Sequence, residues 1–303
     1  MVDFIQNCLD GIAVGSTYAL LAIGFTLIFG VMRRLNLAYG SSIMLGAFVG
    51  TWFFVELNAN AVLVAVITII ATALVGVYVE RLCFWAIWRG AALASMVSSF
   101  AIWMQLEEIA LVLLPNRTYP FPSLTTSPAL TVQLNTASLY LRMEHLWTLA
   151  IALGLMFLLR LLLYQTAFGL RLRAVAEDPH AARYLGINVD MITFWAFLLV
   201  SAIGGVAGYL ILATDQQITP FFGLWATFKG LIAMMLGGMG SLTGAVIGGL
   251  LLGIIEMQSA WYLGGGFRDL SAFFLLFLIL IVRPGGLLGT QAVIQQQASL
   301  RRV

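Results

Sequence analysis

The side chains that most often carry enzyme chemistry are few in this sequence and lie far apart. The chain holds two histidines, His145 and His180, and two cysteines, Cys8 and Cys83. None has the close spacing of a metal site or of a nucleophile with its base. The phosphate-binding pattern G-x-x-x-x-G-K-[ST] does not occur in the sequence. We therefore expect no catalytic residue, no metal site and no cofactor in this chain, and it is not predicted to be an enzyme.

A polar segment at residues 165–190 carries the signals of a short helix with both ends marked. Asp178 is a good N-cap, and Pro179 fits the first helical position. Gly186 stands where a helix ends in the left-handed conformation. A helix of about two turns is not stable alone in water, so it must dock. Either it packs on the ends of its own membrane helices, or it sits in a groove of a cytoplasmic partner.

These polar residues must be positioned by elements that lie mostly in lipid. The 303-residue chain is 61% hydrophobic and 9% charged, with a mean hydropathy of +1.00. A soluble protein carries about 25% charged residues, so this composition does not supply a water-exposed surface. The net charge of +2 is too small to indicate nucleic-acid binding. The sequence predicts an all-α, polytopic transmembrane helical bundle that forms a single domain, residues 1–303.

Apolar runs of membrane length mark the candidate spans. A helix needs about 20 mostly apolar residues to cross about 30 Å of hydrocarbon. The separate runs are 11–32, 35–55, 57–79, 91–114, 146–164, 191–214 and a short one at 270–282. The stretch 216–257 is too long for one helix and is interrupted by glycines, so we expect two short helices near residues 226–258. The total is eight or nine spans.

The arginines predict the orientation, because cytoplasmic loops carry an excess of basic residues. With residues 165–190 placed inside, eleven arginines fall on the cytoplasmic side and three outside. The inside set is Arg33, Arg34, Arg81, Arg89, Arg160, Arg171, Arg173, Arg183, Arg283, Arg301 and Arg302. The outside set is Arg117, Arg142 and Arg268. The N-terminus is then outside and the C-terminus cytoplasmic, which favours nine spans and leaves residues 115–145 as an extended external loop.

Charged groups within the spans are expensive, at least ~2.5–3.5 kcal/mol each at the bilayer centre. Glu56, Glu80, Arg160 and Glu256 lie near span ends, where we expect them to reach the surface or cap a helix. Lys229 is about one turn into its helix, and we expect it to pair within the bundle.

Motifs along nearly the whole chain point to one family. In the polar loop, Ala181, Ala182 and Gly186 form an Ala-Ala-x-x-x-Gly core. The other motifs lie at 15–20 with 29–31, 36–40 with 44–47, 229–230 with 236–241, and 283–287. In this order and spacing, the chain resembles ABC-importer permeases of the branched-chain amino acid family. It departs from the family's usual pattern at His180, where a glutamate is common, and at Tyr39, where a histidine is common.

The resemblance implies a membrane-spanning permease subunit of an ATP-driven importer for branched-chain or other apolar amino acids. It implies a second homologous permease subunit, two cytoplasmic ATPase subunits that hold ATP-Mg, and a periplasmic substrate-binding protein, in a bacterial inner membrane. Residues 165–190 would then be a coupling loop that contacts the ATPase. Its coupling residues are Glu177, Asp178, Pro179, His180, Ala181, Ala182, Leu185 and Gly186. Two alternatives stay open: urea, short amides or aromatic acids as substrates, and a stand-alone secondary transporter or channel.

Two groups of residues are candidates for the translocation path. The first is the polar start of the second span: Asn36, Tyr39, Ser41 and Ser42. The second is the glycine break: Gly237, Gly238, Gly240 and Ser241. The first group either caps its helix and bonds to neighbouring helices or lines the path. At the break, recurring glycines favour ordinary close helix packing, and short helices whose ends face the path are the alternative.

Overall fold

The computed structural model describes residues 2–85, 92–113, 118–125, 130–134 and 137–289. Arg89, Arg117, Arg301 and Arg302, which support the predicted orientation, lie outside these ranges. The chain divides into two compact units, and three of the four boundaries between them fall within helices. These helices are α1 (Val2–Met32), α5 (Met143–Gln165) and α9 (Phe222–Gly237). That the two units act as one membrane domain stays a prediction.

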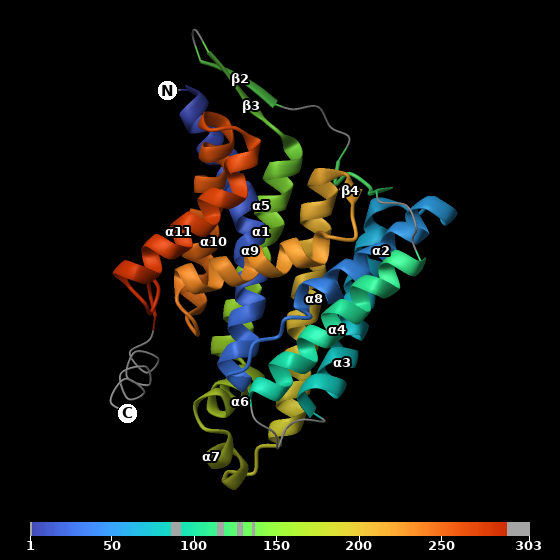
Figure 1. The fold of residues 1–303 in the computed structure, drawn as a ribbon, viewed down its shortest axis with the longest axis vertical. Helices are drawn as coiled ribbons and strands as arrows, with labels where there is room; N and C mark the ends of the chain where they lie inside the picture. Colours follow the sequence, from blue (N-terminus) through green and yellow to red (C-terminus); the bar gives the residue numbers. More distant parts are fainter. Residues whose placement is uncertain (1, 86–91, 114–117, 126–129, 135–136, 290–303) are drawn as a thin grey trace. The chain divides into compact units, whose positions relative to one another are not determined.

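One unit, residues 27–122 and 154–228, is a bundle of apolar helices. Its elements are α2 (Tyr39–Leu57), α3 (Ala61–Val79), the π-helical turn η1 (Glu80–Trp85), α4 (Ala92–Leu113), β1 (Tyr119–Pro120), α6 (Ala167–Glu177), α7 (Pro179–Tyr184), α8 (Val189–Asp215) and β4 (Gln217–Ile218). Helices α2, α3 and α8 pack against one another, and α4 contacts α2 (Figure 1). The short α6 and α7 contact each other and α8 (Figure 1). We call this the α2–α8 unit.

Small residues allow the helices of the α2–α8 unit to approach closely. A Cβ on Gly205 of α8 would lie 2.9 Å from the Cα of Ile69 on α3. A Cβ on Gly46 of α2 would overlap Thr72 of α3. Because lipid offers little hydrophobic drive for helix association, such backbone-to-backbone packing is a main source of cohesion in membrane bundles. This packing holds α8 in place, and α6 and α7 contact α8.

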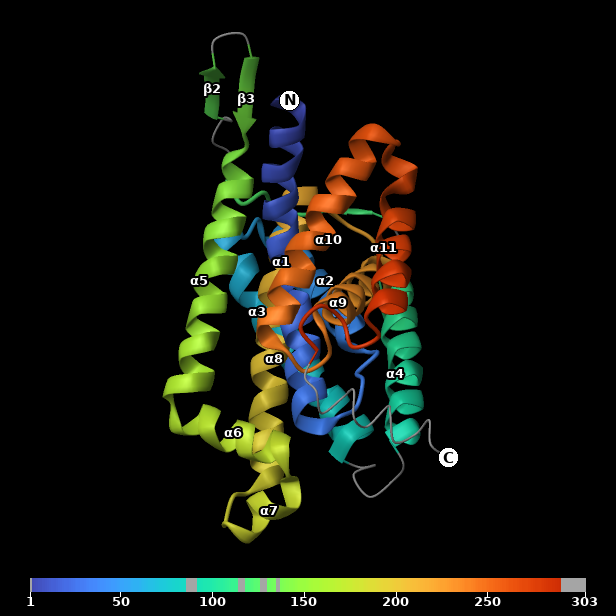
Figure 2. The ribbon, with the colours of Figure 1, turned by 90° about the vertical axis from the view of Figure 1, so that its left-hand side faces the viewer.

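The other unit, residues 1–26, 123–153 and 229–303, contains a helical hairpin. Its further elements are β2 (Leu130–Leu134), β3 (Ala137–Leu141), α10 (Leu242–Tyr262), the 3-10 turn η2 (Gly265–Phe267) and α11 (Arg268–Val282). Helices α10 and α11 run antiparallel (Figure 2). Strands β2 and β3 pair antiparallel, with Leu130 opposite Leu141. We call this the α10–α11 unit.

The glycine break forms where it was predicted, between α9 and α10. Gly238 and Gly240 have positive φ angles of 107° and 85°, which favour glycine. The chain after α11 returns to this break, where Leu287 N and Leu288 N donate to Leu236 O and Gly237 O, both at 2.9 Å. These carbonyls belong to the last turn of α9, which has no intrahelical donors for them. The C-terminal motif at 283–287 thus helps to cap α9.

The predicted spans are confirmed as helices. Among the described residues, eight helices are long and apolar enough to cross a membrane, and α9 is a shorter apolar helix. At 16 residues, α9 is about 24 Å long, less than the ~30 Å of hydrocarbon. A total of nine therefore depends on counting α9 as a span. The segment that was predicted to be an extended external loop contains a hairpin, because the alternating apolar residues of β2 and β3 pair. Its place outside the membrane stays a prediction.

Candidate functional site

Helix α7 is held by its own caps as the sequence predicted. The Asp178 carboxylate accepts hydrogen bonds from His180 N at 2.8 Å and from Ala181 N at 3.2 Å. These bonds, chiefly the one from Ala181 N, hold the pKa of the Asp178 carboxyl below its usual range. At the other end, Gly186 has a φ of 80°, and Ile187 N donates to Ala182 O at 3.0 Å.

The first turn of α8 contacts the C-terminal end of α7. Asn188 caps α8 by accepting from Met191 N at 3.1 Å. Arg183 on α7 forms an ion pair with Asp190 in the first turn of α8, with Nη2 and Oδ1 3.3 Å apart. Exposed pairs of this kind contribute at most about 1 kcal/mol. The caps on both helices, worth about 1 kcal/mol each, therefore stabilise this segment at least as much as the ion pair does.

Helix α7 leaves two large apolar side chains uncovered. Tyr184 is 93% exposed and Leu185, its C-cap, is 79% exposed, whereas Ala182 is 2% exposed. The remaining predicted coupling residues, Glu177, Asp178, Pro179, His180, Ala181 and Gly186, are exposed or half-buried. Tyr184 was not among the predicted coupling residues. It follows Ala181 by three residues and Leu185 follows by four, so both lie on the same side as Ala181. Contact of these residues with an ATPase stays a prediction.

The polar residues at the start of α2 bond within the protein. Asn36 Oδ1 accepts from Ala38 N at 3.1 Å, and the hydroxyls of Ser41 and Ser42 donate to Ala38 O. The Tyr39 hydroxyl donates to Val200 O on α8 at 3.3 Å. All four are buried. The Tyr39 bond favours the interhelical interpretation, whereas no side chain caps the first turn of α2, whose N-cap is Ala38. A path-lining role stays a prediction.

The second candidate group packs tightly around the glycine break. Gly237 is so close to Gly244 that an added Cβ would overlap the backbone of α10. A Cβ on Gly238 would lie 2.5 Å from Gly289 N. Ser241 caps α10 by accepting from Gly244 N at 3.1 Å. Close packing, the favoured interpretation of these glycines, is confirmed, and a role of Gly240 and the others in the path stays a prediction.

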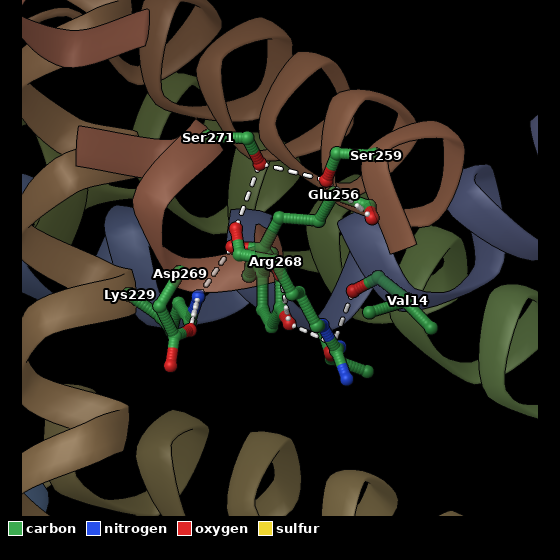
Figure 3. A network of polar contacts seen from close by, with 9 residues as sticks. Val14, Lys229, Glu256, Ser259, Arg268, Asp269 and Ser271 are labelled. Atoms are coloured by element: carbon green, nitrogen blue, oxygen red, sulfur yellow. Dashed lines mark hydrogen bonds and ion pairs between the residues drawn. The ribbon is translucent and has the colours of Figure 1, made fainter. Parts of the chain in front are cut away.

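The α10–α11 unit holds a cluster of charged residues that the sequence analysis did not assemble (Figure 3). Glu256 accepts from Lys229 Nζ, from Arg268 Nε at 3.0 Å and from the Tyr18 hydroxyl at 2.9 Å. Lys229 Nζ also donates to Asp269 Oδ1 at 2.7 Å. Helices α1, α9, α10 and α11 each supply at least one member. We call these five residues the ion cluster.

The ion cluster balances two cations with two anions and is buried at its centre. Glu256 is 0% exposed and Lys229 3%, whereas the side chain of Asp269 is 63% exposed. The expected pairing of Lys229 is confirmed. Glu80 and Glu256 do not reach the surface, since both are buried. Glu80 stands at the C-cap of α3, as the capping alternative predicted, and Glu256 pairs within the bundle. Glu256 stays inside because three donors surround its carboxylate, which offsets the cost of burying its charge.

No group of three or more metal-ligating side chains occurs in the described residues.

Fold and site together define a multi-pass helical membrane protein whose distinctive parts are a capped helix outside the spans and a buried ion cluster. The family model described as "Branched-chain amino acid transport system / permease component" matches residues 7–283. The chain belongs to this family of permease components.

Relatives with curated names match over almost their whole length. The high-affinity branched-chain amino acid transport system permease protein LivH of Escherichia coli (strain K12) is 32% identical over 300 residues, 96% of this chain and 97% of that protein. BraD of Pseudomonas aeruginosa, described in the same words, is 30% identical over 298 residues, with the same coverage. Among solved structures, PsaBC from Streptococcus pneumoniae in complex with Fab matches 91% of this chain at 13% identity, with a TM-score of 0.48, too low to establish a shared fold.

Proposed function

We propose that this chain is the membrane-spanning permease subunit of an ATP-driven importer for branched-chain or other apolar amino acids. The family match over residues 7–283 and the names of relatives such as LivH support this proposal. The chain itself carries no P-loop motif, so ATP-Mg would bind to separate subunits. Alternating access of the permease would then follow motion transmitted from those ATPases.

The observation that carries the proposal is the exposed apolar end of α7. A six-residue helix is too short to persist alone, yet caps at both ends and the buried Ala182 hold it in place. Tyr184 and Leu185 then face outward with almost no cover from their own chain. Aromatic and leucine side chains exposed together on an ordered element are typical of a surface that binds a partner. An ATPase groove is the partner that this family assignment favours.

The proposed assembly contains a second homologous permease subunit, two cytoplasmic ATPase subunits and a periplasmic substrate-binding protein, in a bacterial inner membrane. The proposed orientation has the N-terminus outside and the C-terminus in the cytoplasm. The arginine-rich side, which includes Arg171, Arg173 and Arg183, would then carry α7. The path-lining candidates at the start of α2 and at the glycine break remain part of this proposal.

A second candidate function, a stand-alone secondary transporter or channel, is favoured by one observation. Glu256 and Lys229 are buried ionisable groups, and such groups within membrane segments often mark ion pathways. Against it, the cluster satisfies its charges internally, which accounts for the burial without transport of an ion. ATP-independent uptake by the purified chain alone would favour this second function.

The test is the ATPase activity of the complex, purified with the products of neighbouring genes and reconstituted in lipid. Binding protein loaded with leucine, valine, urea or an aromatic acid is added in turn. We expect stimulation by an amino-acid-loaded form, and stimulation by urea or an aromatic acid would reassign the substrate. If no ATPase co-purifies and the chain alone moves solute down its gradient, the importer proposal is wrong.

The coupling role of α7 needs a substitution that leaves α7 itself intact. Ala182 is the obvious site in the sequence, but it is buried, so a bulky charged residue there would also undock the helix. Tyr184→Ser removes an exposed ring and touches no cap. We expect Tyr184→Ser to uncouple ATP hydrolysis from uptake while the protein reaches the membrane in normal amounts. The matched control, Tyr140→Ser, removes another exposed tyrosine and should transport normally.

A further inference from the structure

The α2–α8 unit contains an apolar cavity at the junction of α6 and α8. The cavity has a volume of about 440 Å³ and is lined by Phe168, Trp195, Leu198, Leu199 and Ala202. The four residues from α8 follow the spacing i, i+3, i+4, i+7, so they form one stripe along that helix. A cavity lined only by such side chains does not hold water stably. Its size and lining suit a hydrocarbon chain.

Helix α6, which contributes Phe168 to the cavity, has the pattern of an interfacial helix. Its buried residues Gly169, Leu172 and Val175 lie on one side, and Arg171 and Arg173 are exposed. A short amphipathic helix with arginines on its polar face typically lies at the level of the lipid headgroups. The cavity therefore opens into the hydrocarbon next to the headgroup region.

Two arginines lie near residues that line the cavity. Arg171 follows Phe168 by one turn of α6. On the α8 side, the Arg81 guanidinium lies 5.1 Å from the centre of the Phe194 ring, and that ring packs edge-on against Trp195 with centroids 5.8 Å apart. Arg81 has Glu80 beside it at 3.5 Å, and the Arg173 guanidinium lies 5.0 Å from the centre of the Tyr164 ring on α5, so Arg171 is the arginine of α6 that we place at the cavity.

We infer that this cavity binds an anionic phospholipid, with an acyl chain between Phe168 and Ala202 and the headgroup phosphate against Arg171. The apolar lining accounts for binding of the acyl chain, and the arginine at the rim accounts for selection of an anionic headgroup. Each arginine close to an anionic headgroup favours binding about fivefold, which corresponds to about 1 kcal/mol. This inference concerns the membrane environment of the chain and holds whatever solute is transported.

The test uses fluorescence quenching of Trp195 in the full complex, reconstituted with acyl-brominated phosphatidylglycerol or acyl-brominated phosphatidylcholine. The signal of a Trp195→Phe variant is subtracted to isolate this residue. We expect stronger quenching by brominated phosphatidylglycerol, with apparent affinity about fivefold higher per arginine involved. Arg171→Gln should remove most of this preference, and Arg160→Gln, an exposed arginine on α5, should leave it unchanged.

A second variant tests the cavity apart from the charge. Ala202→Leu fills part of the space and should reduce quenching by both lipids. Equal quenching of the unaltered protein by both lipids would overturn the inference, because the headgroup would then not be selected. Absence of quenching, together with disulfide crosslinking of an Ala202→Cys variant to the second permease subunit, would also overturn it, since a protein helix would then occupy the cavity.

Discussion

Replacing the central acid of the ion cluster should destabilise the protein strongly. In Glu256→Gln, the amide loses the charge that Lys229 and Arg268 share, while both cations remain in place. Removing one partner of a buried ion pair costs about 3–5 kcal/mol, and here two cations lose the buried carboxylate that balances them, although Lys229 keeps its exposed partner Asp269. For a chain of this size, 1 kcal/mol corresponds to roughly 2 °C or more in Tm. We therefore expect the Tm of the purified complex to fall by at least ~6 °C.

The matched control is the other acid of the same cluster. Asp269 also binds Lys229, but its side chain is 63% exposed, so Asp269→Asn should cost at most about 1 kcal/mol. Adding Lys229→Met to Glu256→Gln should recover part of the lost stability, since one of the two cations that the buried carboxylate balanced is then removed. If Glu256→Gln and Asp269→Asn lower Tm by the same small amount, burial of the cluster does not have the energetic role argued for it.

Three further substitutions have defined outcomes. Gly253→Leu would force a side chain into the backbone of α1 and should destabilise the protein by about 1–3 kcal/mol or more, whereas Gly266→Leu, which has open space around it, should leave Tm nearly unchanged. The Asp178 carboxyl has a lowered pKa, so its contribution to α7 is present at neutral pH and is lost as the pH falls through that lowered pKa. The protection of the 180–185 amides, measured against their intrinsic exchange rates at the same pH, should therefore fall in acid, and in Asp178→Ala it should be low at both pH values. Gly286→Ala requires a side chain at a φ of 79° and 2.5 Å from the Cα of Gly238, and should speed exchange of the 287–288 amides.

Much of the fold was predictable because lipid imposes simple rules on a chain. Apolar length located the ends of the separate spans within about four residues, except that α1 begins at Val2, nine residues before the predicted start, and the glycine break between α9 and α10 was placed correctly. Cap residues such as Asp178 and Gly186 gave the ends of α7, since capping depends on neighbours in sequence. The β2–β3 hairpin was missed because prolines and polar residues around it gave a stronger loop signal than its short alternation.

The side chains that meet in space were harder to predict, because they are distant in sequence. Tyr18 and Glu256 are 238 residues apart, and Lys229 and Asp269 are 40 apart. Taken one at a time, the charged residues were predicted to reach the surface, to cap a helix or to pair with a residue that the sequence did not identify. The exposure of Tyr184 could not be predicted from the sequence either, because it depends on how α7 packs against α8. Local rules therefore placed the elements, and tertiary packing decided which residues became a site.

The glycines and the charges of α10 belong to one feature. Gly249, Gly253 and Glu256 follow the spacing i, i+4, i+7, so they share the face of α10 that packs on α1. A Cβ on Gly15 of α1 would lie 2.8 Å from the Cα of Leu250, which shows how closely the two backbones approach. This approach brings the Tyr18 hydroxyl within 2.9 Å of Glu256, one turn beyond the glycines. A larger residue at either glycine would thus both separate the helices and break the ion cluster, so small residues in a membrane helix can be required by a buried charge as much as by packing.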